Sequence, residues 1–214
     1  MLDTYLLIIA ALFPVVNPPG SALVFLTMTK RATPTIRRLL ARRVAINAFF
    51  VMVGSLLVGA FILKFYGISV PVLRVAGGLV VAVSGWTLLN AGSSKEESTL
   101  TSDPKVEYAS QAFYPLTLPL TTGPGTIAVM ISLGLSRSAY SGHREDFEFF
   151  VSGLLATLTI AGAIYLCFAF SDWVAKFLGK GGVDITVRLS AFILFCLGVQ
   201  IIWTGASDLI KGVG

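Results

Sequence analysis

Two short motifs rich in proline and glycine lie inside long apolar stretches of this chain. Residues 14–21 read PVVNPPGS and residues 119–126 read PLTTGPGT, so both fit the pattern P-x-x-[NT]-x-P-G-[ST]. Proline has no N–H to donate, clashes with the preceding helical turn, and pushes the residue before it out of the helical conformation. Each motif therefore predicts a helix that ends and starts again within an apolar segment.

The residue types around each proline favour such a restart. Asn17 and Thr122 are expected N-caps, Pro18 suits the first helical position, and Ser21 lies in the first turn. A break of this kind exposes N–H donors that suit a carboxylate, and carbonyl groups that suit an ammonium group or a sodium ion. The two motifs together therefore predict a site for an amino-acid zwitterion, whereas the alternative is a pair of proline kinks that serve packing alone.

The candidate substrate-binding residues are Asn17, Pro18, Pro19, Gly20, Ser21, Thr121, Thr122, Gly123, Pro124, Gly125 and Thr126.

Two arginines follow a second matched pattern. Arg74 stands seven residues after Gly67, and Arg188 stands seven residues after Gly181. A charge deep in a bilayer is costly. Each arginine is therefore expected either to extend to the nearer interface or to act as a gate or helix-end clamp.

Composition identifies the elements that must position these residues. The chain has 214 residues, 55% hydrophobic and 13% charged, with a mean hydropathy of +0.84. A soluble domain carries about 25% charged residues, so a soluble enzyme, a disordered protein and a nucleic-acid-binding module are excluded. The expected fold is an all-α integral membrane protein, because six blocks approach the roughly 20 apolar residues that a spanning helix needs. The blocks cover residues 4–28, 45–65, 70–90, 112–135, 149–171 and 189–209.

The matched motifs predict a single transmembrane domain, residues 1–214, built from two repeats. Repeat one covers about residues 1–92, a polar linker about 93–111, and repeat two about 112–214. Because each repeat contributes three spans, the second enters the membrane from the opposite face, which makes the repeat inverted, as in many secondary transporters. The first helix of each repeat is the broken one.

The distribution of charge predicts orientation and mechanism. Six cations and no anion lie within residues 30–43. This bias favours a cytoplasmic location for the segment and an external location for both termini. No acidic residue lies in the middle of a block, which disfavours proton coupling and acid–base catalysis. We expect no enzyme activity, bound cofactor or metal site, and sodium coupling, exchange and passive movement all remain open.

The motifs also resemble those of the MarC family of bacterial inner-membrane proteins, and the resemblance extends over essentially the whole chain. It rests on Asn17-Pro18-Pro19-Gly20, Gly67 to Gly78, Thr122 to Ile127 and Gly179-Lys180-Gly181-Gly182. The resemblance implies a multi-pass protein of the bacterial cytoplasmic membrane. The family includes a small neutral amino acid transporter, the SnatA type, which implies glycine-like or alanine-like substrates.

The sequence therefore predicts a secondary transporter that moves small neutral amino acids by alternating access. One alternative is a pore for water or small neutral solutes, built from two opposed half-helices. Another is a structural or partner-binding membrane protein. The expected partners are the lipid bilayer and the amino acid, without nucleic acid, and homo-oligomer formation is left open.

Overall fold

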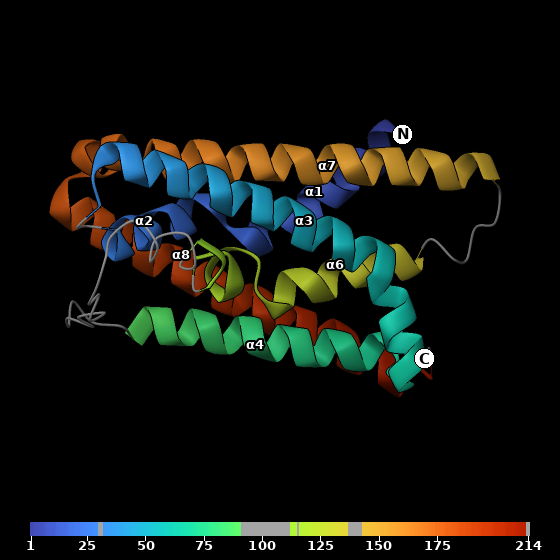
Figure 1. Ribbon diagram of the computed structural model, residues 1–214. Helices are drawn as coiled ribbons and strands as arrows, with labels where there is room; N and C mark the ends of the chain where they lie inside the picture. Colours follow the sequence, from blue (N-terminus) through green and yellow to red (C-terminus); the bar gives the residue numbers. More distant parts are fainter. Residues whose placement is uncertain (30–31, 91–111, 115, 137–142, 213–214) are drawn as a thin grey trace.

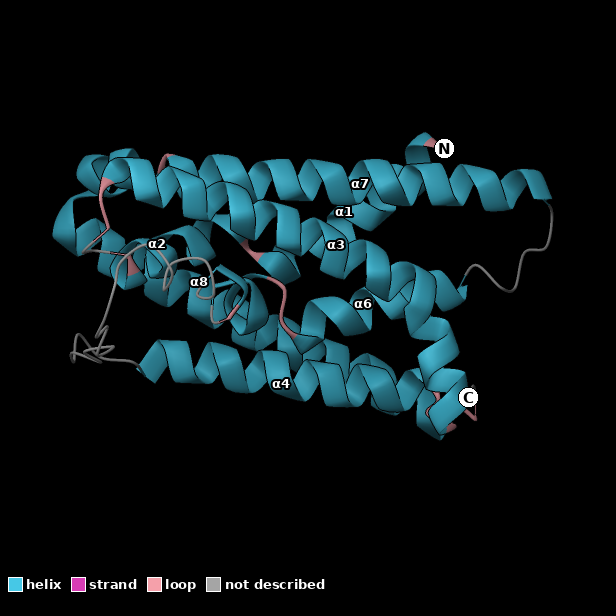
Figure 2. Cartoon of the chain, viewed as in Figure 1, coloured by secondary structure: helices cyan, strands magenta, loops and turns pink. Residues whose placement is uncertain are grey.

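The computed structural model describes residues 1–29, 32–90, 112–114, 116–136 and 143–212. The described residues are almost entirely helical and contain no strand (Figure 2). The predicted all-α class is therefore confirmed. The predicted polar linker, residues 93–111, lies outside the described residues.

Eight helical segments make up the described chain. In order they are α1 (Leu2–Val16), α2 (Pro18–Met28), α3 (Pro34–Tyr66), α4 (Val70–Asn90), the π-helical η1 (Leu116–Thr121), α6 (Pro124–Ser136), α7 (His143–Ala169) and α8 (Ser171–Ile210).

Five of the six predicted blocks correspond to segments long and apolar enough to cross a membrane. These are residues 2–26, 34–66, 70–90, 147–169 and 181–210. The fourth block, residues 112–135, differs because it comprises η1 and the shorter α6. With 13 residues, α6 is roughly 20 Å long, which is less than the roughly 30 Å of a bilayer's hydrocarbon core.

The boundaries of α3 differ from the prediction. The side chain of Thr33 accepts a hydrogen bond from the N–H of Ile36, Pro34 takes the first helical position, and Gly67 ends the helix at φ 66°. These are ordinary start and stop signals. Because α3 begins at Pro34 and not near residue 45, the basic segment around Arg37 is helical and not a loop.

The final helix is also longer than predicted. The sequence suggested a span over residues 189–209, whereas α8 begins at Ser171 and bends at Gly179, which has φ 66° and ψ 174°. Glycine adopts this backbone conformation because it has no Cβ to clash. The bend separates residues 171–178 from the spanning segment, residues 181–210.

The helices run roughly along a common direction (Figure 1). Helix α7 lies along the upper edge of that view, α3 descends from the upper left to the lower right, α4 lies along the lower edge, and η1 and α6 lie between α7 and α4. Both ends of the chain lie at the same end of the bundle, which we call the terminal end. The opposite end, where α3 and α8 begin and where Arg37 lies, we call the arginine end.

Helices α4 and α8 approach each other closely through small residues. A Cβ added at Gly85 would lie 2.5 Å from the backbone nitrogen of Phe195, and one added at Gly198 would lie 2.3 Å from that of Ala82. Small residues at membrane-helix interfaces allow backbones to come this near. Gly85 and Gly198 therefore allow α4 and α8 to pack closely.

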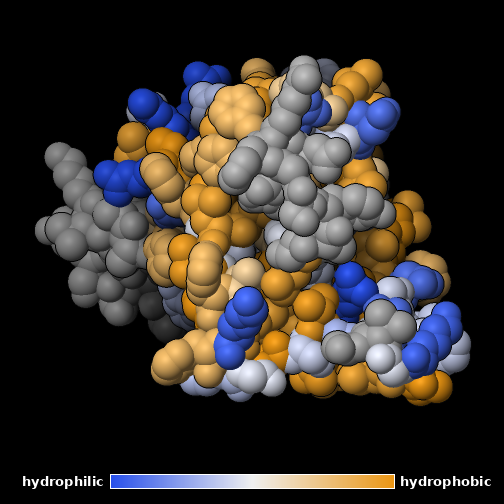
Figure 3. Space-filling view, turned by 90° about the vertical axis from the view of Figure 1, so that its right-hand side faces the viewer, coloured by the Kyte–Doolittle hydropathy of each residue, from blue (hydrophilic) through white to orange (hydrophobic). Residues whose placement is uncertain are grey.

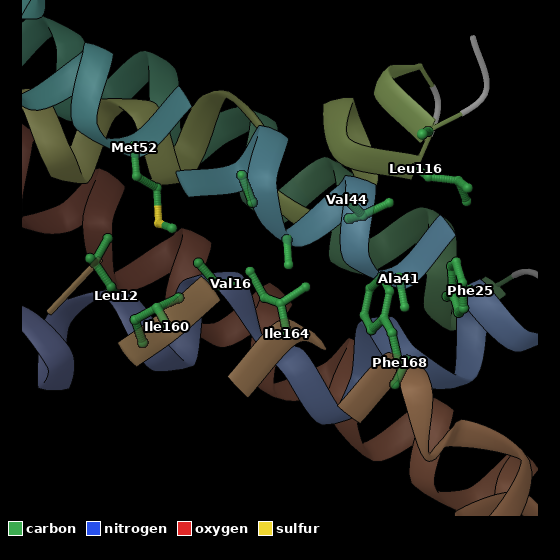
Figure 4. Packing of buried hydrophobic residues seen from close by; sticks show 14 of the residues in the cluster. Leu12, Val16, Phe25, Ala41, Val44, Met52, Leu116, Ile160, Ile164 and Phe168 are labelled. Carbon is green, nitrogen blue, oxygen red and sulfur yellow. The ribbon is translucent and has the colours of Figure 1, made fainter. Parts of the chain in front are cut away.

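The largest buried cluster joins α1, α2, α3 and α7 with η1 (Figure 4). Phe25 and Phe168 stack at its arginine end with ring centroids 4.4 Å apart. Val16 and Leu116, which border the two predicted breaks, belong to the same cluster. The residues that precede the two breaks are therefore packed in the same apolar cluster.

Many large apolar side chains are exposed on the outside of the bundle, including Phe50, Phe61 and Phe192. Hydrophobic residues also dominate the view of the terminal end, where hydrophilic residues form separate patches (Figure 3). The apolar outer side of the helices fits contact with lipid.

Candidate functional site

The first predicted break lies at a single residue, Asn17, which ends α1 and starts α2. Its backbone is left-handed, with φ 45° and ψ 62°, and it is the only non-glycine residue with positive φ among the described residues. Its N–H donates to the carbonyl of Phe13 at 2.9 Å, and its Oδ1 accepts from the N–H of Gly20 at 3.3 Å. The predicted N-cap Asn17 and the predicted first helical position of Pro18 are both confirmed.

The first break does not offer the free N–H donors that we expected. Pro18 and Pro19 have no N–H, the N–H of Gly20 is capped by Asn17, and that of Ser21 donates to the carbonyl of Asn17 at 2.9 Å. This expectation was wrong, because the two prolines lack an N–H group and Asn17 accepts hydrogen bonds from the next two N–H groups.

Carbonyl groups are left over at the first break instead. In a continuous helix the carbonyls of Pro14 and Val15 would accept from the N–H groups four residues later. Those residues are Pro18 and Pro19. The carbonyl of Val16 differs, because it accepts from the hydroxyl of Ser21 at 3.0 Å. The first break therefore presents acceptors from the last turn of α1.

The second break is longer than the first. Inside η1, Leu118 has extended backbone angles of φ −110° and ψ 125°. The N–H of Thr122 donates to the carbonyl of Thr117 at 2.8 Å, and the first α-helical bond of α6 joins the N–H of Ile127 to the carbonyl of Gly123 at 3.2 Å.

The N-cap of α6 is therefore Gly123 and not Thr122, as we had predicted. The residue directly before a proline cannot easily be helical, and Pro124 takes the first helical position. The hydroxyl of Thr122 instead donates to the carbonyl of Thr117 at 3.3 Å.

Buried threonine hydroxyls support the second break. Those of Thr117 and Thr121 donate to the carbonyls of Ala112 and Leu116, at 2.6 and 2.7 Å. Thr117 was missed by the sequence reasoning, although a threonine repeated at positions 117, 121 and 122 of an apolar block was an available signal. These bonds give the buried hydroxyl groups hydrogen-bond partners within the same segment.

Free donors are found at the second break. Within the described part of the chain, no group accepts a hydrogen bond from the backbone N–H of Gly125 or Thr126. Both residues are buried and lie in the first turn of α6. The positive end of the helix dipole lies at the same place. The second break therefore presents donors where the first presents acceptors.

The two breaks are brought near each other but are covered by different helices. Helix α2 contacts η1, and α1 contacts α6. Gly20 packs against Ser190 of α8, where an added Cβ would lie 2.7 Å from the serine Cβ. Gly125 packs against Val81 of α4, where an added Cβ would lie 1.9 Å from Cγ2. Glycine is required at both positions because the neighbouring helix occupies the space of a side chain.

The two matched arginines have different surroundings. Arg74 Nη1 lies 2.6 Å from Asp208 Oδ2, which ties the start of α4 to the end of α8. Arg188 is exposed, and no ion pair connects it with another described residue. Their similar spacing in the sequence does not give them similar contacts.

A third arginine, Arg37, was not singled out from the sequence. It is 8% exposed, forms an ion pair with Asp172 of α8, and donates to the hydroxyl and carbonyl of Thr29 at 3.1 and 2.8 Å. Within a run of basic residues, it has no local signal that separates it from its exposed neighbours.

Comparison with known proteins agrees with a membrane role. The pattern that defines the MarC family of integral membrane proteins matches residues 2–210. The inner membrane protein MarC of Salmonella typhimurium is 32% identical over 208 residues, covering 95% of this chain and 94% of that protein. The membrane protein YvbG of Bacillus subtilis is 32% identical over 201 residues, covering 93% and 92%. A membrane protein of Archaeoglobus fulgidus is 28% identical over 197 residues, covering 92% and 89%.

No solved structure matches the chain. The relatives align over nearly their whole length, and the long apolar helices are those of a protein that crosses the membrane several times. This chain belongs to the MarC family and is a multi-pass integral protein of the inner membrane.

Proposed function

We propose that this protein is a secondary transporter for small neutral amino acids of the size of glycine or alanine. The observation that carries the proposal is the complementary chemistry of the two breaks. The first leaves the carbonyls of Pro14 and Val15 without helical donors, and the second leaves the N–H groups of Gly125 and Thr126 without acceptors among the described residues.

An amino-acid zwitterion matches this division. Its ammonium group suits the carbonyl groups at the end of α1, and its carboxylate suits the N–H groups and positive dipole at the start of α6. The surrounding space favours a small side chain, because Gly20 and Gly125 are already in close contact with Ser190 and Val81.

The pattern of packing supports alternating access between two inverted repeats. Helix α2 packs against α7 and α8, and α6 packs against α3 and α4. The helix that follows each break thus contacts the last two helices of the other half. This symmetry is expected if the two halves take equivalent parts in the transport cycle. In the proposed cycle, one half rocks against the other around the bound amino acid.

A permanently open pore is less well supported. Val16 and Leu116, which border the two breaks, are buried in the apolar cluster. Flux that saturates with concentration and accelerates when substrate is present on the far side would indicate a carrier, whereas flux that rises linearly would indicate a pore. The proposal requires no enzymatic step or bound cofactor, and it includes sodium coupling as a tested variable.

The decisive experiment measures glycine and alanine flux in liposomes that contain the purified protein, with and without sodium. The Pro18→Ala/Pro19→Ala double variant introduces N–H groups that can bond the carbonyls of Pro14 and Val15. We expect it to lose about ten- to a hundredfold in flux, the range for one hydrogen bond to a charged group, while it stays folded. Folding should not suffer, because alanine is also well accommodated in the first turn of a helix.

Pro34→Ala is the matched control, because Pro34 occupies the same first helical position in α3 but is exposed and far from the breaks. It should transport normally. Undiminished flux in the double variant, or no flux of any small neutral amino acid by the native protein, would contradict the proposal.

A further inference from the structure

An open cavity of about 630 Å³ lies at the terminal end of the bundle. It is lined by the end of α3, the start of α4 and the end of α8, including Lys64, Pro71, Arg74 and Asp208. We call it the outer cavity. Its charged lining residues are two cations and one anion, so its net charge favours an anionic group.

A second cavity of about 270 Å³ lies between α4, α6 and α8. Ala128, Ser132 and Gln200 contribute to its lining, and we call it the inner cavity. Ala128 lies one turn after the start of α6 at Pro124. The inner cavity therefore lies beside the second and third turns of α6, the helix that begins at the second break.

Arg74 lines both cavities, and its ion-pair partner Asp208 lines the outer cavity. The two side chains are 28% and 27% exposed. An ion pair this accessible to water contributes little net stability, because both charges keep much of their hydration. A carboxylate that enters the outer cavity can replace Asp208 on Arg74 at little cost.

The other ion pair between a basic side chain of the first half and α8 differs in each of these respects. Arg37, at the arginine end, has a side chain that is 9% exposed and is also held by Thr29 and Ala32. Breaking that contact would leave a buried charge without a partner, which is strongly unfavourable. The ion pair of Arg37 is therefore costly to break, whereas the ion pair of Arg74 is not.

We propose that the outer cavity is an entry site for the carboxylate group of a small ligand. The ligand binds Arg74 in place of Asp208, and this exchange opens the way from the outer to the inner cavity. For an amino acid as the ligand, the proposal rests on the proposed function. The exchange itself concerns any small carboxylate and can be measured without transport.

The test uses Ser132→Cys as a reporter in the inner cavity, with Cys167 and Cys196 replaced by serine. Purified protein in detergent is treated with a small thiosulfonate reagent that carries a sulfonate, and with a matched reagent that carries a trimethylammonium group. Asp208→Asn should speed the anionic reagent by about two- to fivefold, the factor that corresponds to an exposed ion pair. Arg74→Gln should slow it, and the cationic reagent should show neither effect.

Ligand competition provides a second measurement with the native ion pair in place. Glycine and acetate should slow the anionic reagent because both carry a carboxylate, whereas ethanolamine, with an ammonium group alone, should not. Asp184→Asn, which removes an exposed carboxylate elsewhere on α8, is the matched control and should leave the labelling rate unchanged. Thr204→Cys provides a second reporter if the first impairs folding.

Equal labelling rates in the native, Asp208→Asn and Arg74→Gln proteins would overturn the proposal, and so would equal effects of acetate and ethanolamine. A positive labelling result together with absent glycine flux would retain the carboxylate site and reject amino-acid transport. The two proposals can therefore fail separately.

Discussion

The guanidinium of Arg37 donates four hydrogen bonds, to the hydroxyl and carbonyl of Thr29, the carbonyl of Ala32 and the carboxylate of Asp172. A single side chain thus joins the turn between α2 and α3 to the first turn of α8. The planar guanidinium group presents several donors in a fixed arrangement, which lysine cannot reproduce.

Arg37→Met should therefore lower the free energy of unfolding by about 1–3 kcal/mol, because the buried carbonyls of Thr29 and Ala32 lose their donor. Arg38→Met is the control, since Arg38 is exposed on the same helix and should change stability by at most about 0.5 kcal/mol. Denaturant unfolding of the purified proteins in detergent measures both values. Equal stability of the two variants would contradict the structural role of Arg37.

Asn17 combines a strained backbone with a capping side chain, and two substitutions separate these contributions. Asn17→Ala removes the cap and keeps the left-handed conformation under strain, whereas Asn17→Gly removes the cap but tolerates that conformation. Asn17→Ala should be less stable than Asn17→Gly by about 1–2 kcal/mol. The same unfolding assay compares them, and a more stable alanine variant would show that the break is not held in the left-handed conformation.

At the scale of elements, the most extensive helix contact in the described chain is that between α4 and α8. Gly198 of α8 lies against the backbone of Ala82, and Gly205 lies against the carbonyl of Pro71. These contacts involve backbone atoms, which cannot move aside as the tip of a flexible side chain can. The close fit also positions Arg74 of α4 opposite Asp208 of α8.

Gly198→Ala should accordingly destabilise the protein by about 1–3 kcal/mol, the usual cost of an extra group in a filled interior. Gly54→Ala offers a matched control, because a Cβ at Gly54 of α3 would meet no atom within 4 Å. There the change should be neutral or stabilising by about 0.5–1 kcal/mol, since alanine favours helix. Thermal unfolding of both variants measures the difference, and similar melting temperatures would refute the close packing of α4 on α8.

At the scale of the whole molecule, both ends of the chain lie at the terminal end of the bundle (Figure 1). Such an arrangement requires an even number of passes through the membrane, although only five segments are long and apolar enough to cross it alone. The predicted six spans would then require the short α6 and the irregular η1 to form one pass together. Non-helical backbone at this depth is tolerated where protein or a water-filled cavity surrounds it.

Labelling of single cysteines in intact cells can test this arrangement and its predicted orientation. In a variant without Cys167 and Cys196, cysteines at Asp3 and Lys211 should react with a membrane-impermeant maleimide from outside. Cysteines at Arg43 and Lys176, exposed at the arginine end, should react only after the membrane is permeabilised. Labelling of Asp3 and Lys211 from opposite sides would require an odd number of passes and would refute the arrangement.

Features that depend on neighbouring residues could be predicted from the amino acids alone. The apolar blocks indicate membrane helices, and Asn17-Pro18 indicates the end of one helix and the start of the next. The assignment to the MarC family is confirmed as well. By contrast, no local pattern reveals that the hydroxyl of Thr122 donates to the carbonyl of Thr117 in the irregular η1. The substrate, the inverted repeat and the orientation stay predictions.

Sequence patterns do not predict the two arginine ion pairs that connect distant parts of the chain. Arg37 contacts a residue 135 positions away and Arg74 one 134 positions away, and nothing near either arginine in the chain specifies its partner. The packing of α8 against α4 and against the turn after α2 brings these groups together. Helix formation depends on contacts within a few residues, so sequence patterns reveal it. The pairing of distant charges depends on how the helices pack. Only the folded molecule therefore shows that Arg37 is buried, that Arg74 lines the cavities and that Arg188 is exposed.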